Sequence, residues 1–433
     1  VLSKKNDLPA REREIVILRI GYLCRSGYEW TQHTPIGIRA GLTEEEVARI
    51  KSGADAPGWS DADRALMRAS DELHHDQFIT DATWAALKAH FSDKQCMDVV
   101  FTAEFANAGF LRPYTPEETQ RLTAGMLPAP LETGMWEDKL YGAPYKSNAQ
   151  LLWYRKSAAA AAGVDPTSPT FTWDEMIKAA VGQQKKVAVQ AQRYEGYTVL
   201  INALVLSGGG ALLEDVEAGR NAKPSLASPA GEKAAEIVGT LGRSPAAPTD
   251  MSNASEEQAR TNFQSDQGMF MVNWPYVLAA ARSGVEEGTL DQSVVDDIGW
   301  ARYPRVSADR PSAPPLGGAN LGIGAYTKHP DQAVALVECI NAEPKATQYM
   351  LDESEPSPYA ASYDDPKIRE EYANADLIRE SIGDGGPRPP TPFYTDISGA
   401  IQQTWHPPAS VNSDTPERTD QFMADVLAGR RLL

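Results

Sequence analysis

Hydrophobic positions in the N-terminal part of the chain follow the spacing of helices. Ile15, Leu18 and Tyr22 recur every three or four residues, which places them on one helix face. Later helix starts are marked by capping residues, whose side chains bind the free N–H groups of a first turn, at Thr43, Ser60, Thr80 and Ser92. No strand-like alternation of hydrophobic and polar residues interrupts this pattern. Residues 7–97 are therefore predicted to be all-α.

From about residue 98 the pattern changes, and short hydrophobic segments alternate with helical ones. The predicted strands are 151–154, 187–190, 268–273 and 321–325. The predicted helices include 173–181, 195–206, 229–241, 256–263 and 330–341. Such alternation predicts an α/β fold with partly parallel sheets. At the change itself, residues 97–102 suit either a continuing helix or a short strand followed by a new helix.

Composition and charge exclude several classes of protein. Of the 433 residues, 42% are hydrophobic and 23% are charged, as in ordinary globular proteins. Lys and Arg number 41 and Asp and Glu 59, which gives a formal net charge of −18. Because the chain has no concentrated basic segment, binding to nucleic acid is not expected. No hydrophobic run approaches the roughly 20 residues of a membrane span, and the first residues resemble neither a signal peptide nor a lipid-anchor site.

The cysteines do not suggest a metal site. Cys24, Cys96 and Cys339 lie far apart in the sequence and form no zinc-binding spacing. The sequence therefore predicts no metal, and nothing in it requires a cofactor.

Seven segments after residue 97 resemble, in order and spacing, the extracellular sugar-binding proteins of ABC importers, particularly the trehalose-binding lipoprotein type. They are Asp98-Val-Val-Phe-Thr-Ala-Glu-Phe, Lys139-Leu-Tyr-Gly-Ala-Pro, Asn148-Ala-Gln-Leu-Leu-Trp-Tyr-Arg155, Phe263-Gln-Ser-Asp-Gln-Gly268, Val272-Asn-Trp-Pro275, Leu316-Gly-Gly-Ala-Asn-Leu321 and Arg388-Pro-Pro-Thr-Pro. The resemblance implies an α/β, two-lobe periplasmic-binding-protein-like (type II) fold that closes on a sugar. It also implies the permease subunits of an importer as partners, and an extracytoplasmic, membrane-associated location.

The same resemblance implies how residues 98–433 divide between the two lobes. Lobe one would take residues 98–143 and 301–326, and lobe two would take residues 145–298 and 327–433. The chain would cross between the lobes near 143–144 and again near 297–304. The family's usual first strands of lobe one are replaced here by the all-α segment 1–97, so lobe one is expected to lack part of its sheet.

A sugar presents flat C–H faces bordered by hydroxyl groups, so its site needs an aromatic platform with fixed donors and acceptors. Trp274 is the candidate platform, and a place in the core is its alternative. In proteins that resemble this chain, the sugar is bound at the positions that are occupied here by Asp98, Asn148, Glu195 and Arg388. Gly317 and Gly318 would let the main chain approach the sugar.

Each of these residues also has a purely structural interpretation. Asp98 and Asn148 could cap strand ends, Glu195 could begin a helix in solvent, and Arg388 could be a surface charge. Further contacts could come from three tyrosines, for which core or rim packing is the favoured interpretation: Tyr145, Tyr197 and Tyr276.

Residues 7–97 resemble a different family, that of carboxymuconolactone decarboxylases and alkylhydroperoxidase-like proteins. The segments that carry this resemblance are Leu8-Pro-Ala-Arg-Glu-Arg-Glu14, Arg19-Ile-Gly-Tyr-Leu, Tyr28-Glu-Trp-Thr-Gln-His33 and Ala40-Gly-Leu-Thr-Glu-Glu. Peroxidase members carry two thiols where this chain has Ser26 and Glu29, so thiol peroxidase chemistry is excluded at those positions.

Glu29 and His33 share one helix face, and Glu14 could approach them from the preceding helix. A carboxylate beside an imidazole suits proton abstraction next to a carbonyl, the chemistry that the second resemblance suggests. A helix-stabilising ion pair is the favoured alternative. His74 and His75 are expected on a solvated face.

Three interpretations of function follow. The first is binding of a trehalose-like disaccharide by the substrate-binding component of a carbohydrate ABC importer, without catalysis. The second is a decarboxylase-like enzyme carried by the N-terminal helices. The third is a non-functional fusion, because residues 97–102 suit both families and neither resemblance is complete. The greater length of the sugar-binding-like part favours the first.

Overall fold

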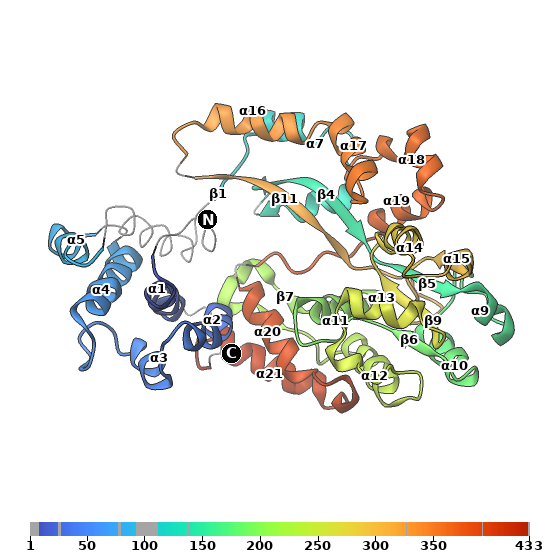
Figure 1. The fold of residues 1–433 in the computed structure, drawn as a ribbon, viewed down its shortest axis with the longest axis horizontal. Coiled ribbons are helices and arrows are strands. Elements are labelled where there is room, and N and C mark those ends of the chain that lie inside the picture. The colour runs from blue at the N-terminus through green and yellow to red at the C-terminus, as the bar shows by residue number, and fades with distance from the viewer. Residues whose placement is uncertain are drawn as a thin grey trace. The chain divides into compact units, whose positions relative to one another are not determined.

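The structure is a computed structural model that describes residues 8–24, 27–76, 79–91, 111–136, 138–325, 327–391 and 393–431. The chain divides into two compact units (Figure 1). The first unit comprises residues 1–110, 392–399 and 425–433, and the second comprises residues 111–391 and 400–424. The domain boundary predicted at residues 97 and 98, and the joint at 97–102, lie outside the described residues.

The first unit is helical over its described residues 8–24, 27–76 and 79–91. Its helices are α1 (Ala10–Leu23), α2 (Gly27–Arg39), α3 (Glu44–Ile50), α4 (Asp61–Asp76) and α5 (Asp81–Lys88). Their hydrophobic faces form one core that buries Ile15 and Leu18 completely. The predicted capping box begins α3, because Thr43 Oγ1 accepts the N–H of Glu46 at 3.1 Å and the Glu46 carboxylate accepts the N–H of Thr43 at 2.8 Å.

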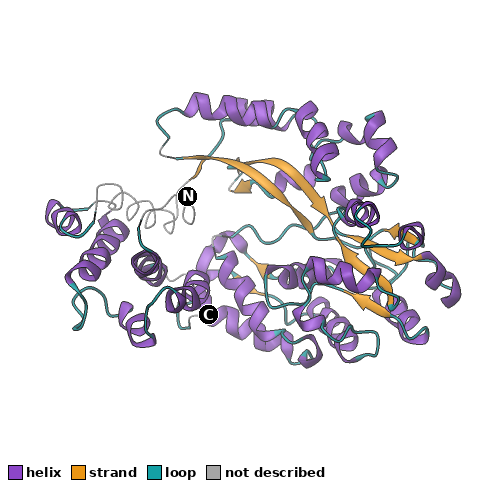
Figure 2. Ribbon diagram, viewed as in Figure 1, coloured by secondary structure: helices purple, strands orange, loops and turns teal. Residues whose placement is uncertain are grey.

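Two sheets form the framework of the second unit (Figure 2). The first sheet is antiparallel, with strand order β1 (Leu111–Arg112), β11 (Leu316–Gly324) and β4 (Gly142–Ala149). The second sheet has strand order β10 (Ile298–Ala301), β5 (Leu151–Arg155), β9 (Gly268–Asn273) and β6 (Lys186–Ala188), in which β6 and β9 are parallel. Short antiparallel pairs are β2 (Met135–Trp136) with β3 (Lys139–Leu140), and β7 (Leu213–Glu214) with β8 (Lys223–Pro224).

Helices surround both sheets. They are α7 (Pro116–Thr123), α8 (Pro128–Glu132), α9 (Lys156–Ala162), α10 (Trp173–Gly182), α11 (Glu195–Ser207), α12 (Pro229–Arg243), α13 (Glu256–Gln264), α14 (Val277–Glu286), α15 (Gln292–Asp296), α16 (Pro330–Ile340), α17 (Glu343–Glu353), α18 (Pro366–Glu371), α19 (Ala375–Gly383), α20 (Tyr394–Thr404) and α21 (Thr415–Leu427). The five helices predicted beyond residue 98 correspond to α10, α11, α12, α13 and α16. Their starts could be predicted because local chemistry fixes them, as where Thr172 caps α10 in a second capping box with Glu175.

Strand β5 lies inside the second sheet, between β10 and β9. Its Trp153 is fully buried and stands opposite Trp300 on β10 and Met271 on β9. The indole Nε1 donates a hydrogen bond to the main-chain oxygen of Asn273 at 3.0 Å. This bond ties β5 to the residue at which β9 ends.

The chain crosses between the sheets at Gln150, and not near 143–144 as expected. Residues 143–149 stay in β4, paired with β11 as far as Ala149 opposite Leu316, and β5 begins one residue after Gln150. Gln150 is buried at the crossing, and its Nε2 donates to Gln190 Oε1 at 3.1 Å. The return crossing runs through residues 302–315, between β10 and β11.

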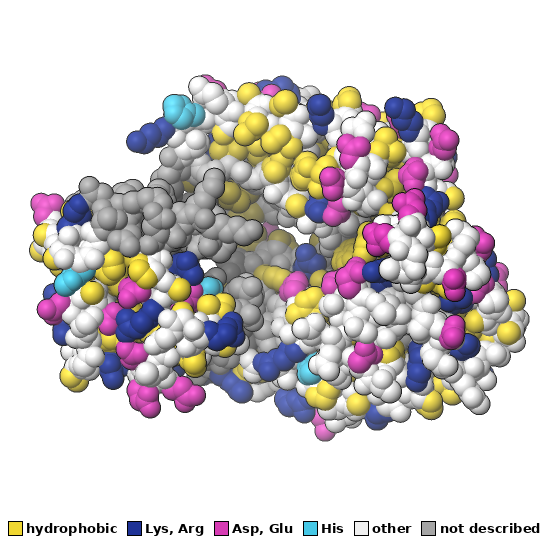
Figure 3. All heavy atoms as spheres, viewed as in Figure 1, with side chains coloured by type: hydrophobic (Ala, Val, Ile, Leu, Met, Phe, Trp, Pro, Cys, Tyr) yellow, Lys and Arg dark blue, Asp and Glu magenta, His cyan; other side chains and the backbone are white. Residues whose placement is uncertain are grey.

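Helix α16 packs on the first sheet. Its Val334 shares a hydrophobic cluster with Leu140 and with Ile323 of β11. The assignment of all of residues 327–433 to lobe two is therefore wrong for α16, because its apolar stripe covers lobe one. Its Leu336 side chain is 60% exposed. Figure 3 shows hydrophobic side chains on the surface in the region of α16.

Candidate ligand pocket

A pocket of about 200 Å³ in the second unit takes its walls from both sheets. Its lining residues are Lys146 and Asn148 on β4, Gly317 and Gly318 on β11, Trp274 and Tyr276 just after β9, and Glu355 after α17. The structure thus brings together four of the seven predicted ligand-binding residues, namely Asn148, Trp274, Gly317 and Gly318. The pocket lies where the two lobes of the expected fold meet.

Trp274 is positioned by the buried end of β9. Asn273 is fully buried, its Oδ1 accepts the N–H of Trp274 at 2.9 Å, and its Nδ2 donates to the main-chain oxygen of Glu256 at 3.0 Å. The indole that follows is only partly buried and faces the pocket. These bonds fix the main chain at Trp274, from which the indole presents an apolar ring face to a ligand.

The two glycines of β11 bring main chain to the pocket wall. A Cβ on Gly317 would lie 2.9 Å from Cη2 and 3.0 Å from Cζ3 of Trp274, so the indole rests directly on the glycine backbone. Gly318 has a φ of +136°, and a Cβ there would lie 2.2 Å from the main-chain oxygen of Lys146. Glycine is therefore required at 318 both by conformation and by space.

Lys146 and Glu355 complete the wall, and sequence reasoning missed both. Lys146 Nζ binds Glu355 Oε1 at 2.6 Å, and Asn148 Nδ2 donates to Glu355 Oε2 at 3.1 Å. The N–H of Ser147 also donates to the main-chain oxygen of Pro356 at 2.9 Å, which fixes the loop after α17 against β4. The Oδ1 of Asn148 is buried and has no hydrogen-bond partner among the described residues.

Two of the predicted residues, Glu195 and Arg388, do not line this pocket. Glu195 begins α11, and its Oε1 lies 3.4 Å from Nε of Arg388, so the two form an ion pair that leaves 45% of Glu195 and 33% of Arg388 exposed. Asp98 lies outside the described residues.

The three tyrosines have different surroundings. Tyr276 lines the pocket, and burial together with Glu257 raises the pKa of its hydroxyl, which stays protonated as a hydrogen-bond donor. Tyr197 is buried in the core and donates to the main-chain oxygen of Trp405 at 2.8 Å, whereas the Tyr145 ring lies 5.0 Å from that of Tyr349.

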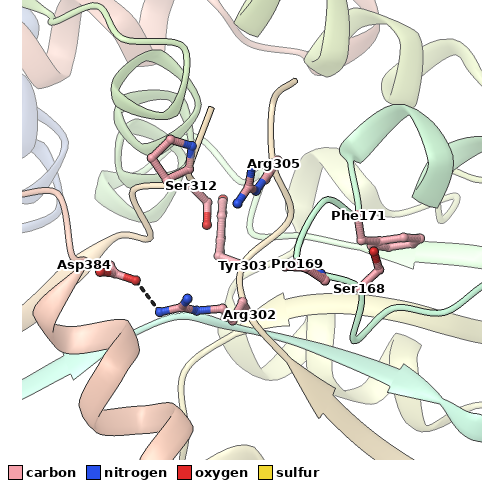
Figure 4. A pocket seen from close by; sticks show the side chains of 9 residues that line it. Ser168, Pro169, Phe171, Arg302, Tyr303, Arg305, Ser312 and Asp384 are labelled. Carbon is pink, nitrogen blue, oxygen red and sulfur yellow. Dashed lines mark hydrogen bonds and ion pairs between the residues drawn. The ribbon is translucent and has the colours of Figure 1, made fainter. Parts of the chain in front are cut away.

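A second pocket lies on the return crossing, around Tyr303 (Figure 4). Arg302 and Asp384 form an ion pair on one side of it, and Arg305 lies on another side. Tyr303 is 2% exposed and packs edge-on against Trp173, with 5.8 Å between the ring centroids. The volume of about 30 Å³ has room for water and is far too small for a sugar.

A third pocket, of about 440 Å³, lies beside α9. It contains the ion pair between Arg155 and Asp297, whose Nε and Oδ2 are 2.8 Å apart, together with Lys185 and Asp266. No aromatic ring occurs among the described residues that line it. It therefore lacks the flat apolar surface that a sugar site needs.

In the first unit, two of the three predicted catalytic residues are in contact. His33 Nδ1 lies 2.6 Å from Oε2 of Glu14, which is 2% exposed, while His33 is about a quarter exposed. The side chain of Glu29 lies outside the described residues. The pair joins α1 to α2 and holds a carboxylate against an imidazole.

The described residues contain neither a candidate metal cluster nor a candidate membrane span. No cluster of three or more His, Cys, Asp or Glu side chains among them could hold a metal ion. None of their helices is long and apolar enough to cross a membrane.

Two family descriptions match the chain. The sequence model of carboxymuconolactone decarboxylases matches residues 1–72, in the helical unit. The model of bacterial extracellular solute-binding proteins matches residues 76–346, more than half of the chain.

Two curated relatives of the chain are named as binding proteins of ABC transporters. A probable ABC transporter-binding protein of Deinococcus radiodurans is 28% identical over 69% of this chain and 66% of its own length. A probable amino-acid ABC transporter periplasmic-binding protein (y4oP) of Sinorhizobium fredii is 24% identical over 67% of this chain and 66% of its own length. The chain thus spans just under two-thirds of the length of these relatives.

Solved structures resemble the chain in fold. Maltose-bound MalE3 of T. maritima has a TM-score of 0.61 and 24% identity, and the match covers 74% of this chain and 81% of that one. The sugar-binding protein MalE of Xanthomonas citri has a TM-score of 0.62 and 17% identity, over 74% and 80% of the two chains. These likenesses confirm the two-lobe periplasmic-binding-protein fold, here with a helical N-terminal segment. The chain belongs to the family of bacterial extracellular solute-binding proteins.

Proposed function

We propose that this chain is the substrate-binding component of a carbohydrate ABC importer, and that it binds a disaccharide of the trehalose type between its two lobes. The observation that carries the proposal is the pocket in which the Trp274 indole rests on the Gly317 backbone, with walls from both sheets. A sugar ring placed on the indole would have hydroxyl groups within the reach of polar side chains around it.

The polar groups of the pocket support a neutral, hydroxyl-rich ligand. Lys146 and Glu355 neutralise each other at 2.6 Å, so the described residues that line the pocket leave no unpaired charge to select an ion. The Asn148 Oδ1 is an acceptor without a partner among the described residues, and the Tyr276 hydroxyl is a donor. Solved structures with this fold hold maltose, tagatose, ribitol and mannitol, which agrees with a polyol or sugar as the ligand here.

The role in transport and the location are parts of the same proposal. Solute-binding proteins of importers work outside the cytoplasmic membrane and deliver their ligand to permease subunits. We assign this chain the same extracytoplasmic place, held at the membrane, and the same partners. The ion pair of Glu195 and Arg388 is proposed to open when the ligand binds, so that Arg388 donates a two-pronged hydrogen bond to the sugar.

The first experiment is a calorimetric titration and a thermal melt of the chain with trehalose, maltose, sucrose, glucose, mannitol and one amino acid. A disaccharide at 100 times its Kd is expected to stabilise the second unit by about 2.7 kcal/mol. A shift of the melting temperature with glucose or mannitol alone would contradict disaccharide binding but would still support binding of a sugar or polyol. A shift with the amino acid alone would overturn carbohydrate binding, and no shift with any compound would favour the non-functional fusion.

The contact between Glu14 and His33 favours a second candidate function, an enzyme that abstracts a proton next to a carbonyl. The two side chains are 2.6 Å apart, close enough for His33 to pass a proton to Glu14. If the unit turns over a carboxymuconolactone-type substrate, Glu14→Gln is expected to lower kcat by about 10²–10⁴-fold, as loss of a general base does. Glu12→Gln, on the same helix, is the matched control. Equal kcat values in the two variants, or no turnover by the unchanged chain, would rule this function out.

A further inference from the structure

The pocket on the return crossing, around Tyr303, is lined by a buried hydrogen-bond donor that has no acceptor. The Tyr303 side chain is 2% exposed, and its hydroxyl has no hydrogen-bond partner among the described residues. The Nε1 of Trp173, whose ring packs edge-on against that of Tyr303, has none either. Burial raises the pKa of Tyr303, so its hydroxyl stays protonated. Because a buried donor without an acceptor is costly, an acceptor is expected here.

The charged side chains around the pocket leave one positive charge without an ion pair. Arg302 is paired with Asp384, which lines the pocket, and with Glu380, which lies outside the lining. Arg305 donates a hydrogen bond from Nη1 to the main-chain oxygen of Ala308 at 2.9 Å, and it forms no ion pair with a described residue. The guanidinium of Arg305 is therefore the surplus charge of the pocket.

Asp309, on the same crossing, does not cancel that charge. A hydrogen bond with Ser307 is the main cause that lowers the pKa of the Asp309 carboxyl. Arg310 and Arg305 lower this pKa further through space, and Arg310 acts more strongly than Arg305. The carboxylate of Asp309 is thus engaged chiefly by groups other than the guanidinium of Arg305.

Main-chain hydrogen bonds hold Arg305 at the wall of the pocket. Its N–H donates to the main-chain oxygen of Phe171 at 2.9 Å, and its own carbonyl accepts the N–H of Trp173 at 2.9 Å. These two bonds join the crossing to the start of α10. Figure 4 shows the side chains of Tyr303, Arg305 and Ser312 side by side, and all three line the pocket. The guanidinium therefore extends from a fixed point of the fold beside the unpartnered hydroxyl.

The pocket suits an ion about the size of a water molecule. Its volume of about 30 Å³ exceeds the roughly 10–15 Å³ that one water molecule requires. A halide ion is only slightly larger than water, and it accepts hydrogen bonds from N–H and O–H groups in several directions. A water molecule could accept the Tyr303 hydroxyl, but it would leave the charge of Arg305 unbalanced.

We propose that this pocket binds one chloride ion, held by the Arg305 guanidinium and the Tyr303 hydroxyl. The ion supplies the acceptor that the buried hydroxyl lacks and the negative charge that the guanidinium lacks. It lies on the segment that returns the chain from the second sheet to the first, so its binding stabilises the second unit. The site is separate from the sugar pocket, and it does not depend on which ligand binds there.

The test compares the full chain in sodium chloride and in sodium gluconate, whose anion is too large for the pocket, at one constant ionic strength. Chloride at ten times its Kd is expected to raise the melting temperature of the second unit by about 2–4 °C. Broadening of the chlorine NMR line reports bound chloride directly and should saturate with the same Kd. Sodium sulfate at the same ionic strength should behave like gluconate, because screening alone does not distinguish these anions.

Three variants identify the groups that hold the ion. Arg305→Gln is expected to abolish both effects of chloride, whereas Arg310→Gln, on the same crossing but outside the pocket lining, should keep them. Tyr303→Phe removes only the hydroxyl and should weaken chloride binding by at least about tenfold, as loss of a hydrogen bond to a charged group does. In gluconate the same variant should melt no lower than the unchanged chain, because it loses a buried donor that has no partner there.

Several results would overturn the proposal. Equal melting temperatures and equal chlorine line widths in chloride and gluconate would mean that the pocket holds water only. Equal losses in Arg305→Gln and Arg310→Gln would mean that the crossing responds to its overall charge and not to a bound ion. An unchanged chloride affinity in Tyr303→Phe would exclude the hydroxyl as a ligand, whatever the effect of the arginine variants.

Discussion

Replacing Trp274 by alanine is expected to weaken binding of the proposed disaccharide by at least about 30-fold. Aromatic residues at the centre of a binding site typically contribute about 2 kcal/mol or more, which corresponds to that factor. The large effect is expected because Trp274 and Tyr276 are the aromatic residues among the described lining residues, and because the Trp274 indole already lies against the Gly317 backbone. Calorimetric titration of the variant gives Kd directly.

The control for this substitution is Trp136→Ala. Trp136 on β2 is also a partly buried tryptophan, and it does not line the pocket. Its replacement should leave Kd within about twofold of that of the unchanged chain. If both variants bind equally well, Trp274 is not the platform, and the pocket has been assigned to the wrong ligand.

Replacing Trp153 by alanine should lower the free energy of unfolding of the second unit by about 3–5 kcal/mol. The ring is fully buried inside the second sheet, and the change also removes the hydrogen bond from Nε1 to the oxygen of Asn273. Urea denaturation followed by circular dichroism measures the effect. Because the chain has two units, the shift of each transition midpoint should be compared separately.

Leu336→Ala provides the contrast in the same unit. That side chain is 60% exposed, so its truncation should change stability by no more than about 0.5 kcal/mol. A loss of less than about 1 kcal/mol for Trp153→Ala would contradict the position of this ring in the core.

Secondary-structure elements that are fixed by residues close together in the sequence could be predicted. Elements that depend on contacts between distant parts of the chain could not. Helices α3 and α10 begin at capping boxes, whose residues are three positions apart, so their starts are visible in the sequence. Strand β4 was not predicted, because Gly142, Pro144 and its polar residues are poor strand formers. Its conformation comes from pairing with β11, some 170 residues later, which also explains why the crossing at Gln150 was placed too early.

The residues of the pocket likewise include some that could be predicted from the sequence and some that could not. Asn148, Trp274 and the two glycines lie in segments that resemble the sugar-binding family, and the structure places them around one pocket. Glu355 follows α17 without any local pattern, and only the fold brings its carboxylate to Lys146, 209 positions away. In the first unit, the contact of Cys24 Sγ with His74 Nδ1 at 3.5 Å is of the same kind, since it depends on the packing of α1 on α4, and it leaves His74 partly buried and not on a fully solvated face as predicted.

The close approach of the Trp274 indole to Gly317 makes these two positions energetically interdependent. Any side chain at 317 would begin within about 3 Å of the six-membered ring, so it must displace the indole before it can fit. With a smaller residue at 274, the three nearest contacts of the side chain at 317 would be removed. The cost of a substitution at one position therefore depends on the residue at the other, and their individual effects on stability and affinity cannot be added. A change of ligand preference in this pocket requires the pair to be exchanged together.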